Sequence, residues 1–328
     1  MFNIAQIYNV SPQNFDQTAL DCFWHQYKNN PLYRQFVDLL RVNPHKIRHI
    51  ENIPFLPISF FKTHEIKTDS WEELAIFKSS GTSGDTTSKH YIKDLNHYQI
   101  NATQGFEQFY GPIKEYAILA LLPSYLERQD SSLIFMVDFF IKKSKFSESG
   151  FFLYNTQELA DRLSQCIEKK IPILLWGVTY ALLDFAAEHP MTLPKGSIVM
   201  ETGGMKGRRK ELLREEVHQI LSCAFQQEQI HSEYGMTELL SQAYSKGNGL
   251  FRPANTMKIL IRDSTDPLTI LPNGRAGGIN IIDLANIDSC CFIACDDLGR
   301  VYEDGSFEVL GRFDASDIRG CNLLTEIG

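Results

Sequence analysis

Several features that would classify a protein at once are missing from this chain of 328 residues. No apolar run is long enough to span a membrane, since Ile171–Val178 is too short, and the N-terminus lacks the basic region and apolar run of a signal peptide. The net charge of -8 includes no long basic block, which disfavours nucleic acid and anionic membranes as partners. The seven cysteines form no CxxC pair, a pattern typical of free thiols in a reducing compartment. We therefore expect a cytoplasmic protein.

The composition is that of a globular protein, with 43% hydrophobic and 22% charged residues. Near-continuous apolar runs alternate with helical patterns of ten or more residues between 116 and 234, which predicts a parallel α/β architecture. After about residue 250, short strands separated by turn residues predict a smaller β-rich portion, with a hairpin over 299–310. We expect an α/β core over 1–250, a β-rich subdomain over 251–310, and a hinge remnant and tail over 311–328.

Individual elements follow from the same patterns. We expect helices within 12–41 and over 94–110, 131–141, 155–169, 177–187 and 209–224, an extended segment over 52–66, and strands over 116–122, 151–154, 171–176, 197–201, 229–234, 257–262, 278–283 and 290–295.

The stretch around which the chain is organised is Phe77–Tyr91, FKSSGTSGDTTSKHY, rich in Ser, Thr and Gly and carrying Lys89. Small side chains, hydroxyls and accessible backbone N–H groups suit a loop that wraps a polyphosphate, and a lysine supplies a point charge for its oxygens. The spacing is not that of a Walker motif. Taken alone, such a run is also compatible with an ordinary solvated loop.

Three further segments carry polar residues of possible chemical use: EYGMTE (233–238), CDDLGR (295–300) and GRFDASDIRG (311–320). Each has a plainer interpretation: a strand end with Thr237 capping a helix, a turn, and a surface loop. Glu238 offers the hard oxygen that magnesium prefers, and Asp297 is an acceptor suited to ribose hydroxyls. Gly203 and Gly204, at a predicted strand end, would let a nucleotide approach the backbone.

The order and spacing of these four segments resemble the adenylate-forming enzymes, which include acyl-CoA ligases and nonribosomal adenylation domains. The resemblance spans roughly residues 77–320 and implies an ATP- and Mg²⁺-dependent enzyme with the fold of that superfamily. It assigns the nucleotide and metal to Thr237 and Glu238, the ribose to Asp297 and Arg312, adenine stacking to Tyr234, and a hinge to Asp314. The residues that it implies for nucleotide binding are Ser79, Ser80, Gly81, Thr82, Ser83, Gly84, Lys89, Gly203, Gly204, Tyr234, Gly235, Thr237, Asp297 and Arg312, with Lys89, Glu238 and Cys321 as catalytic residues and Glu238 as metal ligand.

A narrower resemblance rests on IPFLPISFFKTHEI (53–66), LLPSYLERQDSSL (121–133), ETGGMKGRRKEL (201–212) and GRFDASDIRGCNLL (311–324). These segments look like the LuxE family, the acyl-protein synthetases of bacterial bioluminescence. That resemblance implies that a fatty acid is activated as acyl-AMP and then carried as a thioester on a cysteine that matches Cys321, before transfer to a partner reductase. A thiolate is a good nucleophile toward an acyl-adenylate, although a free cysteine is equally often a small buried apolar residue.

One departure from the wider superfamily concerns the C-terminus. Full adenylating enzymes continue beyond the hinge with a lysine-bearing lid domain, whereas this sequence stops about fifteen residues past Arg312, so we expect the lid to be essentially absent. Two alternatives to an acyl-protein synthetase stay open: an enzyme that passes an aryl or acyl acid to CoA or a carrier protein, and a nucleotide-binding partner protein without full catalysis.

Overall fold

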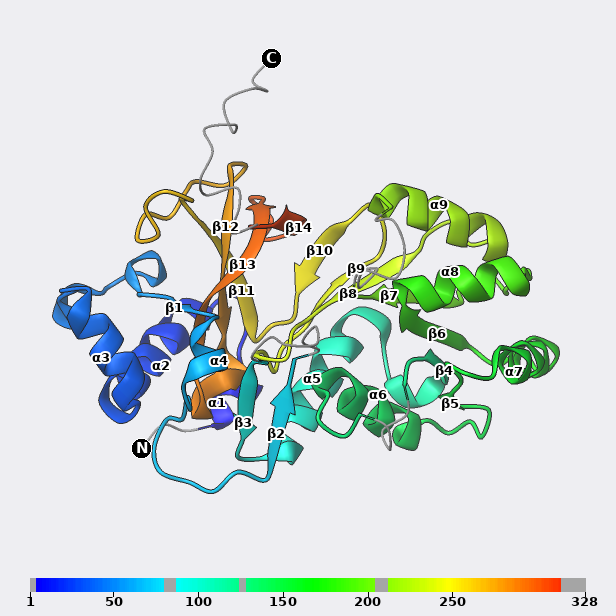
Figure 1. Cartoon of the computed structure of the whole chain (residues 1–328), viewed down its shortest axis with the longest axis horizontal. Coiled ribbons are helices and arrows are strands. Elements are labelled where there is room, and N and C mark those ends of the chain that lie inside the picture. Colours follow the sequence, from blue (N-terminus) through cyan, green and yellow to red (C-terminus); the bar gives the residue numbers. More distant parts are fainter. Residues whose placement is uncertain (1–3, 80–86, 124–127, 204–211, 314–328) are drawn as a thin grey trace, which may run out of the picture.

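The computed structural model describes residues 4–79, 87–123, 128–203 and 212–313 (Figure 1). The helices, with short 3₁₀ helices written η, are α1 (Ala5–Tyr8), α2 (Phe15–Asn29), α3 (Pro31–Leu39), η1 (Pro44–Lys46), η2 (Ile50–Asn52), α4 (Phe60–Thr63), α5 (Leu95–Tyr110), η3 (Ile113–Glu115), α6 (Ser132–Lys143), α7 (Thr156–Glu168), α8 (Thr179–Glu188), α9 (Arg214–Phe225) and η4 (Leu284–Asp288). The strands are β1 (Leu56–Pro57), β2 (Ala75–Lys78), β3 (Lys89–Ile92), β4 (Ala117–Leu121), β5 (Gly150–Phe151), β6 (Ile173–Val178), β7 (Ile198–Thr202), β8 (His231–Tyr234), β9 (Ala243–Ser245), β10 (Leu250–Pro253), β11 (Met257–Arg262), β12 (Ala276–Asp283), β13 (Phe292–Val301) and β14 (Phe307–Arg312).

One mixed sheet runs through both halves of the molecule, in the order β11-β12-β13-β14-β10-β9-β8-β7-β6-β4-β5, with β1 paired to β13. The strands from β4 to β8 pair in parallel, and those from β8 onward pair antiparallel, apart from the parallel β1–β13 contact. A separate hairpin is formed by β2 and β3. The predicted α/β architecture with a β-rich later portion is confirmed.

Local sequence explains where several helices begin. Asp94, Ser131 and Asn155 lie at the N-caps of α5, α6 and α7, and each side chain accepts a backbone N–H of the first turn. In α3, the cap Asn30 is followed by Pro31, whose fixed φ suits the first helical position. These caps satisfy donors that the helix itself leaves free, and they confirm the predicted helix starts to within a residue or two.

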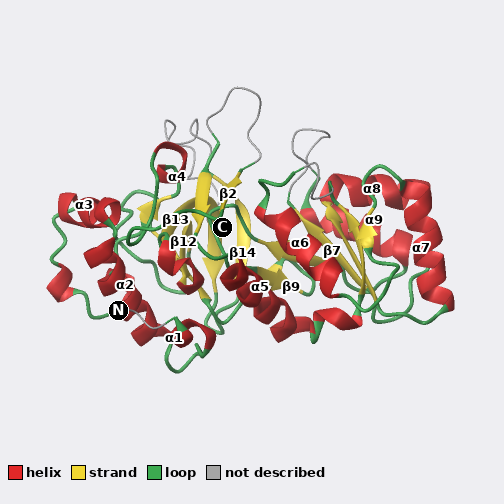
Figure 2. Ribbon diagram, turned by 90° about the horizontal axis from the view of Figure 1, so that it is seen from below, coloured by secondary structure: helices red, strands yellow, loops and turns green. Residues whose placement is uncertain are grey.

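Two hydrophobic clusters divide the core. One lies between the parallel strands and α5 to α9, and includes Phe106 and Trp176. The other joins the N-terminal helices to the antiparallel strands, where the rings of Phe23 and Tyr33 lie 6.4 and 6.0 Å from that of Phe292. Figure 2 shows α2 and α3 at one end of the molecule and α7 to α9 at the other, with strands between them. Residues before 66 therefore share a core with strands after 250, while the predicted boundaries at 250 and 310 stay predictions.

Several predicted elements need correction. Segment 52–66 contains the two-residue strand β1 and the single-turn helix α4, and is not extended throughout. The helix predicted from 209 begins at Arg214, because Leu212 and Leu213 are not helical. The strand predicted from Cys290 begins at Phe292, although Cys290 and Cys291 are fully buried, as expected of core residues.

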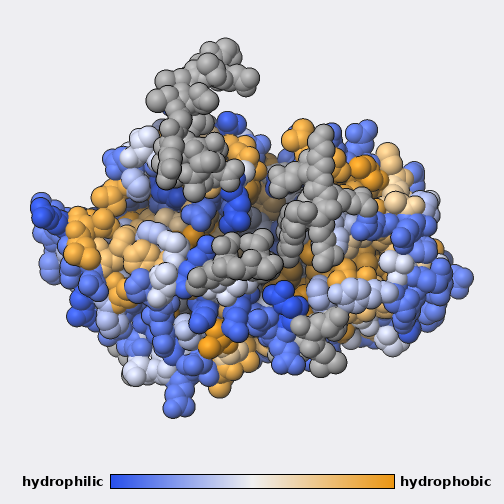
Figure 3. Space-filling model, viewed as in Figure 1, coloured by the Kyte–Doolittle hydropathy of each residue, from blue (hydrophilic) through white to orange (hydrophobic). Residues whose placement is uncertain are grey.

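The outer surface is mixed in polarity. On the face drawn in Figure 3, hydrophilic residues cover much of the edge and hydrophobic residues are visible over both halves. Among the described residues, no helix combines the length and apolar character that crossing a membrane requires.

Candidate functional site

Three residues from separate predicted segments meet where the ends of β8 and β14 lie beside the middle of β13. The Tyr234 hydroxyl donates to Asp297 Oδ2 at 2.8 Å, and Arg312 Nε lies 3.2 Å from Asp297 Oδ1. Asp297 and Arg312 are direct cross-strand partners in β13 and β14. The segment 296–300 is part of a strand, so the plainer interpretation of CDDLGR as a turn is wrong.

Asp297 is a mostly buried carboxylate held by one neutral and one charged donor. Burial raises its pKa, and the Tyr234 hydrogen bond and the Arg312 charge oppose that rise. The Arg312 side chain is 74% exposed, so much of its guanidinium faces solvent. The Tyr234 ring packs against Phe251 and Phe307, at centroid distances of 5.9 and 5.5 Å. The three residues together present acceptors, donors and an aromatic surface at one place.

The base of the Ser/Thr/Gly loop is closed by two reciprocal hydrogen bonds between Ser79 and Ser88. The Ser79 N–H donates to the Ser88 carbonyl at 3.2 Å, and the Ser88 N–H donates to Ser79 Oγ at 3.0 Å. His90 lies two residues after Ser88, and its Nδ1 atom is 2.8 Å from the Thr237 carbonyl oxygen. The loop between β2 and β3 is therefore rooted beside the EYGMTE segment, even though about 150 residues of chain separate them.

Glu238 lies at this junction and is only 5% exposed. Burial raises the pKa of its carboxyl, while a hydrogen bond with the Ser88 side chain and the charge of Arg312 act in the opposite direction. The EYGMTE segment that carries Glu238 also carries Tyr234, which connects this junction to the Tyr234–Asp297–Arg312 group. No helix begins at Thr237, since residues 235–242 lie between β8 and β9 without forming one, so the helix-cap interpretation is wrong.

Glu238 fits the role of a single protein ligand to magnesium. It supplies a carboxylate in a site with other oxygen atoms nearby, and magnesium is commonly held by one or two carboxylates together with substrate phosphates. Within the described ranges, no group of three or more His, Cys, Asp or Glu side chains could hold a metal ion by itself.

Lys89 lies at the base of the Ser/Thr/Gly loop. It is exposed at the start of β3, where its strand partner is Lys78. Because side chains alternate along a strand, Lys89 lies on the opposite face of β3 from the buried His90. The structure thus brings His90, rather than Lys89, against Thr237.

Gly203 directly follows β7 and lies in the left-handed region, with φ of 67°, a conformation that favours glycine. The Thr179 hydroxyl contacts both the Gly203 carbonyl and Glu201 Oε2, the latter at 2.8 Å. Burial raises the pKa of Glu201, but hydrogen bonds from neighbouring side chains, including His218, outweigh it and leave the pKa lowered. An ionised carboxylate thus anchors the strand end at Gly203.

Gly235 is a second glycine with a side chain packed closely against it. A Cβ at this position would lie 2.5 Å from Glu233 Oε1, closer than real Cβ contacts come. The other Glu233 oxygen accepts the Thr202 hydroxyl. Burial raises the pKa of Glu233 to about 7, and the negative charge of Glu201 adds to the rise. A carboxyl that is about half protonated near neutral pH therefore packs directly against Gly235.

We expect Glu233→Gln to change the pH dependence of stability. A carboxyl whose pKa is raised on folding stabilises the protein below its unfolded value, near 4.5, and this contribution is lost as pH rises toward 7. Glutamine stays neutral, so the variant should match the wild type at pH 4, below the unfolded pKa, and unfold at a temperature several degrees higher at pH 8.5, a gain of up to about 3 kcal/mol. Thermal unfolding at both pH values measures this, and an equal effect at both would contradict it.

Sequence reasoning did not single out Ser88, Thr179 or Glu233, and gave His90 little weight. The alternation of Ser88 and His90 on one side of β3 was visible as a pattern, but nothing in the sequence showed which side faces the site. Eight of the expected residues lie outside the described ranges: Ser80, Gly81, Thr82, Ser83, Gly84, Gly204, Asp314 and Cys321.

Comparison with known structures shows the fold. ATP-bound MatB from Rhodopseudomonas palustris superposes with a TM-score of 0.54 at 16% identity, covering 73% of this chain and 48% of MatB. The open conformation of 2-hydroxyisobutyryl-CoA ligase, in complex with 2-HIB-AMP and CoA, gives a TM-score of 0.66 at 10% identity, covering 91% of this chain and 74% of the ligase. The chain thus spans about half the length of MatB. This is the fold of the adenylate-forming enzymes.

Sequence comparison finds similarity to one group of proteins in particular. Residues 4–102 match the family model of the LuxE acyl-protein synthetases. The long-chain-fatty-acid–luciferin-component ligase of Vibrio harveyi is 24% identical over 334 residues, covering 92% of this chain and 84% of that protein. The match over nearly the whole length agrees with the family model, and the two comparisons together support the LuxE acyl-protein synthetase family for this chain.

Proposed function

We propose that this protein is an ATP-dependent acid–thiol ligase that activates a fatty acid as acyl-AMP and transfers the acyl group to a protein cysteine. The observation that carries the proposal is the meeting of dispersed segments at one site. Asp297 contacts both Tyr234 and Arg312, and Arg312 lies near enough to Glu238 to affect its pKa. Such an arrangement suits a nucleotide, because it offers ribose acceptors, cationic donors and a metal carboxylate together.

In the first step, the acid's carboxylate oxygen attacks the α-phosphorus of ATP, and pyrophosphate leaves. Asp297 and Arg312 would hold the ribose, with Tyr234 orienting Asp297 and offering its ring to adenine. Thr237, Gly235, Gly203 and Gly204 would line the nucleotide site, and the loop from Ser79 to Gly84 with Lys89 would contact the phosphates. Magnesium, held by Glu238, would neutralise charge on the phosphate oxygens.

In the second step, a thiolate attacks the acyl carbonyl of acyl-AMP, a thioester forms and AMP leaves. We assign this thiol to Cys321, which lies outside the described residues, on its match to the family's carrier cysteine. The acyl group would then pass to an acceptor protein such as a reductase. The named ligase from Vibrio harveyi supports a long-chain fatty acid as the substrate. Since the described cysteines are free thiols, we place this chemistry in the cytoplasm.

The test is carboxylate-dependent exchange of labelled pyrophosphate into ATP, with Mg²⁺ and a panel of fatty and aryl acids. We expect exchange with fatty acids and none without added acid. Exchange restricted to aryl acids would favour a ligase that serves CoA or a carrier protein. Thermal stabilisation by ATP with no exchange for any acid would overturn the proposal in favour of a nucleotide-binding partner protein.

A further inference from the structure

Two consecutive backbone carbonyls in the EYGMTE segment accept hydrogen bonds from buried side chains of other elements. His90 of β3 lies 2.8 Å from the Thr237 carbonyl, and Asn286 Nδ2 of η4 donates to the Glu238 carbonyl at 2.7 Å. His90 is 1% exposed and Asn286 is fully buried. A carbonyl oxygen can only accept, so the His90 ring must carry its proton on Nδ1. Both bonds are shielded from water, which makes each costly to lose.

The segment that they hold has little regular structure of its own. Between β8 and β9, its internal backbone contact is a single turn, with the Leu239 N–H donating to the Met236 carbonyl at 3.0 Å. Beyond Glu238, the buried Asp283 carboxylate accepts the N–H groups of Leu240 and Ser241, at 2.7 and 3.0 Å. The position of Glu238 is therefore determined by side chains that come from β3, η4 and the end of β12.

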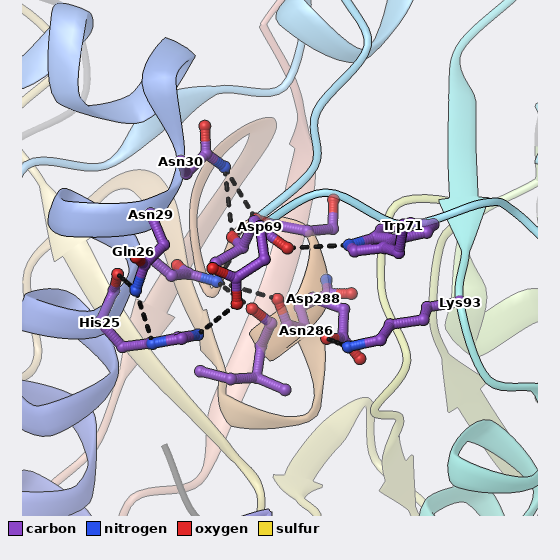
Figure 4. Close-up of polar contacts among 12 residues, drawn as sticks. His25, Gln26, Asn29, Asn30, Asp69, Trp71, Lys93, Asn286 and Asp288 are labelled. Atoms are coloured by element: carbon purple, nitrogen blue, oxygen red, sulfur yellow. Dashed lines mark hydrogen bonds and ion pairs between the residues drawn. The ribbon is translucent and has the colours of Figure 1, made fainter. Parts of the chain in front are cut away.

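The loop that carries Asn286 is anchored in turn by the N-terminal helices (Figure 4). Gln26 Nε2 of α2 donates to the carbonyls of Asn286 and Ile287, each at 3.0 Å, and Gln26 Oε1 accepts the Cys291 N–H at 2.9 Å. Asn30 Nδ2 donates to the Ser289 carbonyl at 3.0 Å. On the opposite side of this loop, Lys93 lies 2.8 Å from Asp288.

We propose that His90 and Asn286 are positioning residues that set the location of Thr237 and Glu238 for a metal-bound nucleotide, and that the N-terminal helices act on the site through Asn286. This inference rests on the proposed function for the identity of the ligand. Neither side chain needs to touch the nucleotide, because each acts through a backbone carbonyl next to a ligand-binding side chain. The N-terminal third of the chain is then part of the machinery of the site.

The expected effect is that of losing an outer partner of a metal ligand, about 10- to 100-fold in metal affinity. His90 offers a matched pair of substitutions, since an asparagine amide nitrogen takes the place of Nδ1, whereas a glutamine amide nitrogen lies one bond further out. His90→Asn should keep the bond and His90→Gln should misplace it. Asn286→Leu removes the donor at nearly the same volume.

A suitable control variant loses a buried side-chain hydrogen bond to a backbone carbonyl in another part of the molecule. Gln227 is a buried side chain whose Nε2 donates to the Leu193 carbonyl at 2.9 Å, behind α9 and away from the site. Gln227→Leu should therefore lower the unfolding temperature without changing metal binding. The full chain is titrated with Mn²⁺ in the presence of a non-hydrolysable ATP analogue, and bound metal is read by electron paramagnetic resonance.

We expect His90→Gln and Asn286→Leu to weaken Mn²⁺ binding about 10- to 100-fold, and His90→Asn and Gln227→Leu to stay within about threefold of wild type. Wild-type affinity in folded His90→Gln and Asn286→Leu would overturn the inference, as would equal losses in His90→Gln and His90→Asn. Should the wild type bind Mn²⁺-nucleotide but catalyse no exchange, the proposed function fails while the comparison of variants still decides the positioning role.

Discussion

Replacing Cys321 by alanine is expected to abolish covalent labelling of the protein by a radioactive fatty acid in the presence of Mg²⁺ and ATP, while leaving pyrophosphate exchange within about twofold of wild type. Exchange reports formation and reversal of acyl-AMP, which needs no thiol. The label reports the second step, in which only a nucleophile can capture the acyl group. One substitution thus separates the two proposed half-reactions.

Cys223 provides the matched control, because it is an exposed free thiol in α9. Cys223→Ala should retain the full label, and neutral hydroxylamine should release that label as expected of a thioester. The six cysteines among the described residues otherwise include only buried ones, where burial raises the pKa of a thiol such as Cys290 to about 12 and makes it a poor nucleophile. Persistence of the label in Cys321→Ala would exclude Cys321 as the carrier.

The fold was largely predictable because each element carries its own local pattern. β6 reads ILLWGV and is buried at every position, as a central parallel strand requires. Asn155 precedes an amphipathic helix and caps it. The correction at 52–66 has a physical reason too: Pro54 and Pro57 exclude a long helix, but they do not prevent the single turn at Phe60–Thr63 that follows them.

The candidate site was predictable in its segments but less so in its contacts. The motif pattern pointed to Asp297 and Arg312, and strand pairing places them opposite each other. The pattern also favoured Lys89, which is exposed and whose contact with phosphate stays a prediction, but it did not reveal that strand alternation directs His90 toward Thr237. Which face of a strand is buried depends on what packs against it, and a single short strand does not carry that information.

The long-range polar contacts were the least predictable part of the site. The Gln26 bond to the Asn286 carbonyl joins residues 260 positions apart, and the Asn286 bond to the Glu238 carbonyl joins residues 48 apart. Neither residue belongs to a motif, and a buried amide leaves no periodic signal in the sequence. The role of such residues can be recognised only once the structure shows which backbone groups they hydrogen-bond.

Substituting Glu238 by glutamine is expected to reduce pyrophosphate exchange by more than about 100-fold, because the change removes the proposed metal ligand itself and not merely an outer partner. The neutral amide has nearly the same shape, so the fold should be kept. Burial already makes the ionised form of Glu238 costly, as its raised pKa shows, and the neutral variant should be at least as stable as the wild type. Loss of activity with undiminished unfolding temperature would mark a residue retained for chemistry at some cost in stability.

Glu148→Gln is the matched control for this prediction. Glu148 is also 5% exposed, but it lies on the parallel-strand side of the molecule. Its Oε1 forms an ion pair with Lys169 Nζ at 2.6 Å, which stabilises the ionised carboxylate. Its pKa is lowered, chiefly by the Lys169 hydrogen bond, so neutralising it should reduce stability and leave exchange unchanged. Glu238→Gln is thus expected to lower activity without lowering stability, and Glu148→Gln to lower stability without lowering activity. Pyrophosphate exchange by Glu238→Gln at the wild-type rate, over a range of Mg²⁺ concentrations, would show that Glu238 is not the metal ligand.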